Sequence, residues 1–235
     1  VSFIKKGWIN RNQVILMGKP YRFSIPVKQQ SQNVLIKDTL VSDLPKFADK
    51  FLRQLETSYR ASPFKSVVLD YVSEVLSGTN GSISDVAIHS VELFFDYLGV
   101  KKSFHRSSLD FSDSRAIGKA ERLIRITKAL NSCEYINSIG GISLYDKEFF
   151  SLSGIELSFI KPRLIPYPQL NSNGGCFHEG LSIIDMMMNV AMVIIHFLSL
   201  VMFMKIVLAV DIQKNQIWAD AAMIFSAKFF QNTHI

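Results

Sequence analysis

The chain has 235 residues, of which 48% are hydrophobic and 18 are phenylalanine. This length and composition fit one large domain or two small ones, and they exclude a disordered protein. The formal charge of +6 suits anionic partners, and a well-solvated surface explains the same charge equally well. Because the lysines and arginines are scattered, they form no continuous nucleic-acid-binding stripe, and we expect no DNA partner.

The first half of the chain predicts a hairpin followed by helices. Residues 13–17 and 21–27 are rich in β formers and flank Gly18, Lys19 and Pro20, which predicts a β-hairpin. Residues 34–41 predict a further extended segment. Apolar positions at helical spacing predict three helices. They are expected after the caps Ser42 and Asp43, over residues 64–76 before Gly78, and over residues 84–98 before Gly99.

The second half predicts strands that alternate with helices. A basic helix is expected over residues 115–130, and buried strands over residues 133–136 and 155–160 flank a short helix at 147–153. This alternation indicates the α/β class, as a layered mixed sheet with flanking helices in a single domain. We expect one central sheet that includes the segments near Val14, Tyr21, Cys133 and Leu157.

A pair of glycines marks one candidate binding segment. Gly140 and Gly141 stand between two apolar runs and are followed by Tyr145 and Asp146. Paired glycines allow positive φ and let the backbone approach a ligand closely. An apolar run, a glycine turn and a helix start also follow one another at the strand ends where α/β sheets bind ligands. An ordinary connection between a strand and a helix explains the same spacing.

A second candidate is the segment from Trp8 to Asn12. Arg11 can hold a carboxylate or phosphate with two hydrogen bonds, and Trp8 offers a ring face to a base or a sugar. Asn10 and Asn12 add amide groups on either side of the arginine. The alternative explanation is a solvated strand end with one tryptophan in the core.

A third candidate is Asp185, which lies among apolar residues. A buried carboxylate must be paired, capped or functional, because an isolated buried charge is too unfavourable. One explanation is a carboxylate at a helix start that accepts from backbone N–H groups, and the other is a role in a site. His178 and Glu179 precede it closely and are suited to acid and base chemistry.

The chain contains no sequence signature of a metal or cofactor site. Cys133 and Cys176 lie far apart, without a Cys-x-x-Cys motif or a Cys/His ligand spacing. There is also no glycine-rich phosphate loop or dinucleotide-binding fingerprint. We therefore expect no metal, no cofactor and two free thiols in a cytoplasmic protein.

Three segments together resemble the WbqC-like family, whose members are found with genes for O-antigen and other bacterial surface polysaccharides. The match covers roughly residues 1–189. Its segments are residues 6–12 with the later Ile25-Pro26-Val27, residues 135–159 with Gly140-Gly141, Leu144-Tyr145-Asp146, Phe149 and Gly154-Ile155, and the group Tyr167, Gln169, Phe177 and residues 181–185.

The resemblance implies a role in O-antigen, lipopolysaccharide or other surface polysaccharide biosynthesis. It suggests a transferase that places an acyl or aminoacyl group on a sugar or sugar-nucleotide intermediate. The alternative is a non-catalytic protein that binds a sugar nucleotide or a glycan-assembly partner. The candidate catalytic residues are Asp185 and His178, and the candidate substrate-binding residues are Trp8, Asn10, Arg11, Asn12, Gly140, Gly141, Tyr145, Asp146, Tyr167 and Gln169.

The chain departs from the family pattern at two places. One is its start, and the other is the apolar tail, residues 190–235, which follows the family-like residues 1–189. The family opens with a strand and a Gln-Pro-x-Tyr-x-Pro segment that this chain lacks, so we expect part of an active site to be absent. For the tail we favour a shifted reading frame over a buried helix, and a membrane-spanning helix comes last.

Overall fold

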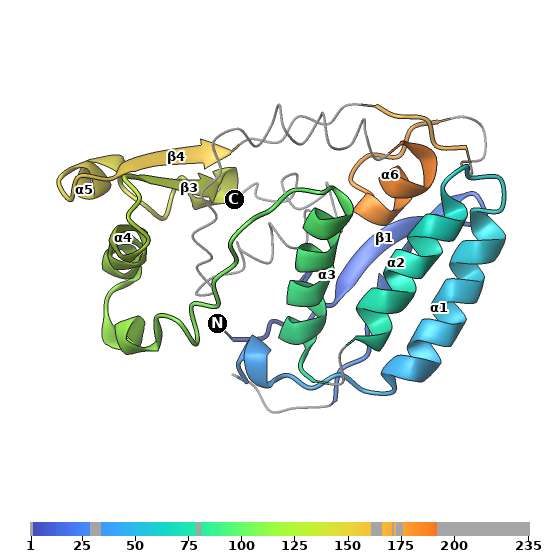
Figure 1. Ribbon diagram of the computed structural model, residues 1–235, viewed down its shortest axis with the longest axis horizontal. Helices are drawn as coiled ribbons and strands as arrows, with labels where there is room; N and C mark the ends of the chain where they lie inside the picture. Colours follow the sequence, from blue (N-terminus) through green and yellow to red (C-terminus); the bar gives the residue numbers. More distant parts are fainter. Residues whose placement is uncertain are drawn as a thin grey trace.

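The computed structural model describes residues 2–28, 34–78, 81–160, 166–170, 172 and 176–191. These residues form helices and two small sheets, which confirms the mixed α/β class (Figure 1). The tail hypotheses concern residues 190–235, of which residues 192–235 lie outside the described residues. Within the described ranges, no helix combines the length and the apolar character needed to cross a membrane.

The predicted hairpin consists of β1 (Arg11–Leu16) and β2 (Lys19–Ser24), which pair antiparallel with Val14 opposite Tyr21. The turn is shorter than the sequence predicted, because only Met17 and Gly18 form it, with φ of 52° and 76°. Two positive φ values match the twist of the flanking strands. Pro20 therefore belongs to β2, the outer strand of this pair, where a missing N–H is tolerated.

Three long helices and one short helix pack with this hairpin. They are α1 (Leu44–Ser58), α2 (Lys65–Ser77), α3 (Ile83–Tyr97) and α6 (Ile183–Asn189). Pro45 occupies the first turn of α1, Gly78 caps the end of α2, and Ser82 forms a capping box with Asp85 at the start of α3. The predicted strand at 34–41 is instead a 3-10 helix, Ile36–Asp38, between isolated bridges.

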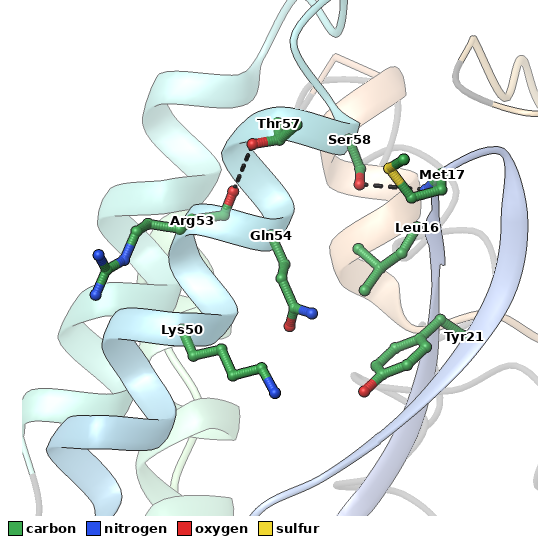
Figure 2. A pocket seen from close by; sticks show the side chains of 8 residues that line it. All are labelled: Leu16, Met17, Tyr21, Lys50, Arg53, Gln54, Thr57 and Ser58. Atoms are coloured by element: carbon green, nitrogen blue, oxygen red, sulfur yellow. Dashed lines mark hydrogen bonds between the residues drawn. The ribbon is translucent and has the colours of Figure 1, made fainter.

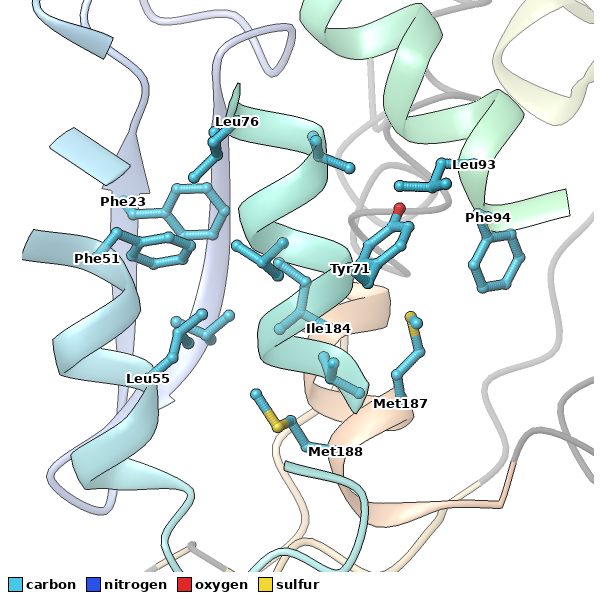
Figure 3. Close-up of a cluster of buried hydrophobic side chains, with 14 of the residues drawn as sticks. Phe23, Phe51, Leu55, Tyr71, Leu76, Leu93, Phe94, Ile184, Met187 and Met188 are labelled. Carbon is cyan, nitrogen blue, oxygen red and sulfur yellow. The ribbon is translucent and has the colours of Figure 1, made fainter. Parts of the chain in front are cut away.

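Side chains from all of these elements meet in what we call the first core. Phe23 of β2 packs on Phe51 of α1 with the ring centroids 4.5 Å apart. Ile184, Met187 and Met188 of α6 enter the same cluster, beside α2 (Figure 3). The short α6 thus joins the end of the described chain to its first strands.

The remaining elements form a second core. They are α4 (Lys119–Ala129), β3 (Glu134–Ser138), α5 (Lys147–Ser151) and β4 (Glu156–Ile160). The strands β3 and β4 are parallel, with Tyr135 opposite Leu157. Phe150 of α5 is completely buried and stacks on Tyr135 at 5.7 Å. The basic helix starts later than predicted, because Gly118 caps it and residues before Gly118 form a 3-10 helix, Ser112–Ala116.

The expected single central sheet is wrong. Val14 and Tyr21 lie in the hairpin, whereas Leu157 lies in the parallel pair, and the two sheets share no strand pairing. The physical reason is that each sheet buries its apolar residues against its own helices, in two separate clusters. Figure 1 shows β1 with α1, α2, α3 and α6 at one end of the molecule and α4, α5, β3 and β4 at the other.

Candidate functional site

Asp185 is the centre of a buried hydrogen-bond network. Its side chain has no exposed surface, and each carboxylate oxygen accepts a tyrosine hydroxyl. Tyr59 donates to Oδ1 at 2.5 Å and Tyr167 donates to Oδ2 at 2.8 Å. Hydrogen bonds to an ionised acceptor are among the stronger ones in proteins. The sequence offered backbone N–H groups of a helix start as one possible set of partners for this carboxylate. In the structure its partners are side-chain hydroxyls instead.

The local structure explains how Asp185 reaches this position. Ser182 caps α6 by accepting the N–H of Ile184 at 3.2 Å, and its own N–H donates to the carbonyl of Gln13 at 2.7 Å. The start of α6 is thereby fixed to the edge of β1 that does not face β2. Tyr59 follows the last residue of α1, and its hydroxyl accepts the N–H of Ile15 on that same edge at 2.9 Å.

Burial and hydrogen bonding act on Asp185 in opposite directions. Burial is the largest influence and raises the pKa of the Asp185 carboxyl above its ordinary value. The Tyr59 and Tyr167 hydroxyls, the charge of His178 and the Gln169 side chain lower this pKa, but the net direction is upward. Burial, followed by the charge of Asp185, also raises the pKa of Tyr167, so this phenol remains a protonated donor.

The segment that carries Tyr167 is held across α6 by a second set of bonds. The Gln169 amide donates to the His178 carbonyl at 2.9 Å and accepts the His178 N–H at 2.8 Å. The side-chain amide oxygen (Oδ1) of Asn189 accepts the N–H of Leu170 at 3.2 Å. These bonds position His178 close enough for its charge to act on Asp185. His178 is only partly buried, whereas Asp185 is enclosed.

The segment from Asn10 to Asn12 contains buried polar atoms that have no partner within the described part of the chain. They are Oδ1 of Asn10, Nε of Arg11 and Nδ2 of Asn12. The other ends of both amides are used, because Asn10 donates to the Ile25 carbonyl at 2.8 Å and Asn12 accepts the Gln13 N–H at 2.8 Å. An unpartnered buried polar group is unfavourable by about 1–3 kcal/mol. This segment is therefore suited to a polar ligand.

The predicted roles of Trp8 and Arg11 fit this segment only in part. The Arg22 guanidinium lies over the Trp8 ring, 5.2 Å from its centroid, so one face of the indole is already in contact. Side chains alternate along β1, which begins at Arg11, so Arg11 points to the opposite side of the strand from Asn12. A single ligand therefore does not reach both side chains from one side of the strand.

The glycine segment belongs to the second core. Gly140 and Gly141 form a 3-10 turn, Ile139–Gly141, directly after β3. Neither glycine has the positive φ that the sequence suggested, because the turn is right-handed. Ser138 precedes them at the carboxyl end of the parallel pair, and its buried hydroxyl has no partner among the described residues. This is the sheet edge at which parallel strands commonly present a ligand site.

Two predicted binding residues have structural contacts in the second core. Tyr145 is buried and packs edge-on against Phe150, with the ring centroids 6.1 Å apart. Asp146 caps α5 by accepting the N–H of Glu148 at 2.9 Å. Both side chains are thus accounted for by packing and capping.

The structure brings together one of the three predicted groups. Asp185, Tyr167, Gln169 and His178 form a single network, whose individual hydrogen bonds were not predicted from the sequence. No described hydrogen bond, ion pair or ring contact joins Asn10–Asn12 to Gly140–Gly141, which lie in different elements and beside different cores.

Tyr59 was not among the site residues predicted from the sequence. One signal could have identified it, since it continues the buried stripe of α1 four residues after Leu55. A buried tyrosine hydroxyl normally needs a hydrogen-bond partner. Within the described ranges, no three His, Cys, Asp or Glu side chains form a metal-binding group, and both cysteines are free and exposed.

Comparison with known proteins identifies a family. The model of the WbqC-like protein family matches residues 1–195. Neither the curated proteins nor the solved structures contain a match to this chain. The matched range includes the hairpin, both cores and the whole Asp185 network.

Proposed function

Because the chain belongs to the WbqC-like protein family, we propose that it is a transferase that places an acyl or aminoacyl group on a sugar intermediate. Membership in this family indicates a role in polysaccharide-related biosynthesis. The specific proposal is O-antigen or lipopolysaccharide assembly in the cytoplasm, with a sugar or sugar nucleotide as the acceptor.

The observation that carries this proposal is the buried Asp185 carboxylate, together with the partly exposed His178, whose backbone is bonded to Gln169 of the neighbouring segment. Transfer to a sugar hydroxyl or amine requires a base that removes a proton as the new bond forms. His178 is the group suited to this step, because it is partly exposed. Asp185 attracts the imidazole when the ring is protonated, and its own oxygens are occupied by Tyr59 and Tyr167. We therefore assign Asp185 a positioning and electrostatic role.

Substrate binding is assigned to the start of β1. The unpartnered Asn10 oxygen can accept from a sugar hydroxyl, and the unpartnered Asn12 nitrogen can donate to one. Both amides come from the same core as the Asp185 network, since β1 accepts the N–H of Ser182. Gly140 and Gly141 lie beside the other core, so we leave them outside this proposed site.

The test is a transfer assay that uses UDP-linked and dTDP-linked amino sugars as acceptors. Acetyl coenzyme A and aminoacyl-tRNA serve as alternative donors, and mass spectrometry detects the modified sugar. We expect His178→Ala to reduce kcat about 100-fold, as for loss of a general base, while the Kd for the sugar nucleotide stays within about threefold. His105→Ala, which alters a partly exposed histidine paired with Asp110, is the matched control and should retain activity.

A non-catalytic binding protein is the second candidate. The complete burial of Asp185 favours it, because neither oxygen is open to a substrate. In that case no donor gives a product, and Asp185→Asn leaves sugar-nucleotide binding unchanged or removes it. A catalytic protein loses turnover in Asp185→Asn and keeps binding. Calorimetry with the same sugar nucleotides measures this difference.

A further inference from the structure

A groove between α1 and the β-hairpin is lined by side chains that take no part in the Asp185 network. Its volume is about 670 Å³, which falls within the range of small-molecule sites. One wall is a single face of α1 and the other is the hairpin (Figure 2). The lining residues are Leu16, Met17, Tyr21, Lys50, Arg53, Gln54, Thr57 and Ser58.

The hairpin side of this groove is apolar and open. Leu16 is buried at its base, whereas Tyr21 is 42% exposed and Met17 is 79% exposed. Large apolar side chains left in water favour an apolar occupant, because covering them releases hydration water. The hydroxyl of Ser58 is already bonded to the Met17 N–H at 3.4 Å, so it adds little polarity to this end.

The opposite end of the groove carries a positive charge. Figure 2 shows Lys50 and Gln54 pointing across the groove toward Tyr21, while Arg53 extends along the outer side of α1. Lys50 takes part in none of the four ion pairs formed within the described ranges. Lys50 and Ser58 are eight residues apart on α1, which corresponds to about 12 Å along the helix.

From this arrangement we propose that the groove binds a medium-length hydrocarbon chain that ends in a carboxylate. The carboxylate pairs with the Lys50 ammonium, since one compact cation matches one negative charge. The chain lies along Tyr21 and Leu16, and its end lies under Met17. The proposal does not involve Asp185 or His178, so its failure would leave the proposed transferase function untouched.

The experiment is a calorimetric titration of the full chain with decanoate below its micelle concentration. We expect a Kd of about 1 mM or tighter, in the range of weak but specific sites. Hexanoate should bind at least about tenfold more weakly, because each methylene withdrawn from water contributes to affinity. Lys50→Glu should weaken decanoate binding by about tenfold or more and should allow the cation decyltrimethylammonium to bind instead.

Lys119→Glu is the matched control, because Lys119 is an exposed lysine on α4 in the second core. It changes the net charge equally and should leave the Kd within about twofold. Circular dichroism of each variant verifies that the fold is retained. Equal weakening by Lys50→Glu and Lys119→Glu, or equal binding of decanoate and decyltrimethylammonium by the wild type, would overturn the proposal. The proposal would also be overturned if the wild type did not bind decanoate and Tyr21→Ser changed the oligomeric state. That result would identify a second copy of the chain as the occupant of the groove.

Discussion

The two cores of this molecule are held together over very different distances along the chain. In the first core, the bond between Tyr59 and Asp185 joins residues 126 positions apart. In the second core, the apolar cluster is drawn from Leu123 to Leu157, and the buried Arg122 bonds to Ser107 only 15 positions away. The second core is therefore built from one continuous stretch, whereas the first depends on both ends of the described chain.

This difference separates the two cores energetically as well. Segments that make few contacts with the rest of a protein can open independently of it. We therefore expect a change in one core to leave the amide protection of the other core largely intact. It follows that the site assigned to the first core depends on side chains that come together only when the whole first core is formed.

The largest effect is expected for Phe150→Ala in the second core. Phe150 is completely buried between Tyr135 and Tyr145, and truncating such a side chain destabilises by about 3–5 kcal/mol. Hydrogen exchange should then accelerate in α4, β3 and β4 and stay slow in α1 and α2. Phe51→Ala is the matched variant in the first core and should show the reverse distribution. Equal acceleration in both cores would show that they open as one unit.

A somewhat smaller effect is expected for Asp185→Ala. This substitution leaves the hydroxyls of Tyr59 and Tyr167 without their shared acceptor, and we expect a loss of about 3 kcal/mol in the free energy of unfolding. Urea denaturation measures the loss. The Tyr167→Phe variant removes one of the two tyrosine bonds to Asp185 and leaves the Ile15 N–H paired with Tyr59, so it should lose less than half as much. A loss below about 1 kcal/mol in Asp185→Ala would mean that the network contributes little to the first core.

Much of the secondary structure was predictable because its signals are local. Pro45 in the first turn of α1, Gly78 after α2 and Ser82 before α3 each act within a few residues. The pairing of the strands was not predictable, because an apolar strand pattern identifies a buried face but not the strand beside it. Val14 and Leu157 therefore looked equally suited to one sheet.

The candidate site shows the same limit. The position of Asp185 among apolar residues was enough to predict a buried carboxylate that needs partners. Its two tyrosine partners could not be predicted, since Tyr59 lies at the end of a helix more than a hundred residues earlier. The positive φ suggested for Gly140 and Gly141 was wrong for a related reason, because paired glycines after a strand are compatible with several turns, including the right-handed 3-10 turn that forms.

The pH dependence of stability tests whether burial or hydrogen bonding dominates at Asp185. Since the pKa in the folded protein is raised above the ordinary 3.8, the folded state binds a proton that the unfolded state has released. The wild type should therefore gain stability relative to Asp185→Asn as the pH falls from 7 toward 4. Each unit of pKa difference corresponds to about 1.4 kcal/mol. A relative loss of stability over this window would show that the tyrosine bonds outweigh burial.

The smallest effects are expected for two buried serines that differ in their partners. Ser182→Ala removes the hydroxyl that caps α6 in the first core, and we expect a loss of about 1 kcal/mol. Ser138→Ala removes a hydroxyl that has no partner within the described residues of the second core. Its removal should change stability by less than about 0.5 kcal/mol, because no bond is broken and the burial of a polar group is relieved. Both variants are compared by urea denaturation under the same conditions. If Ser138→Ala were as destabilising as Ser182→Ala, the Ser138 hydroxyl would have a hydrogen-bond partner. This hydroxyl would then not be free to bind a ligand at the end of β3.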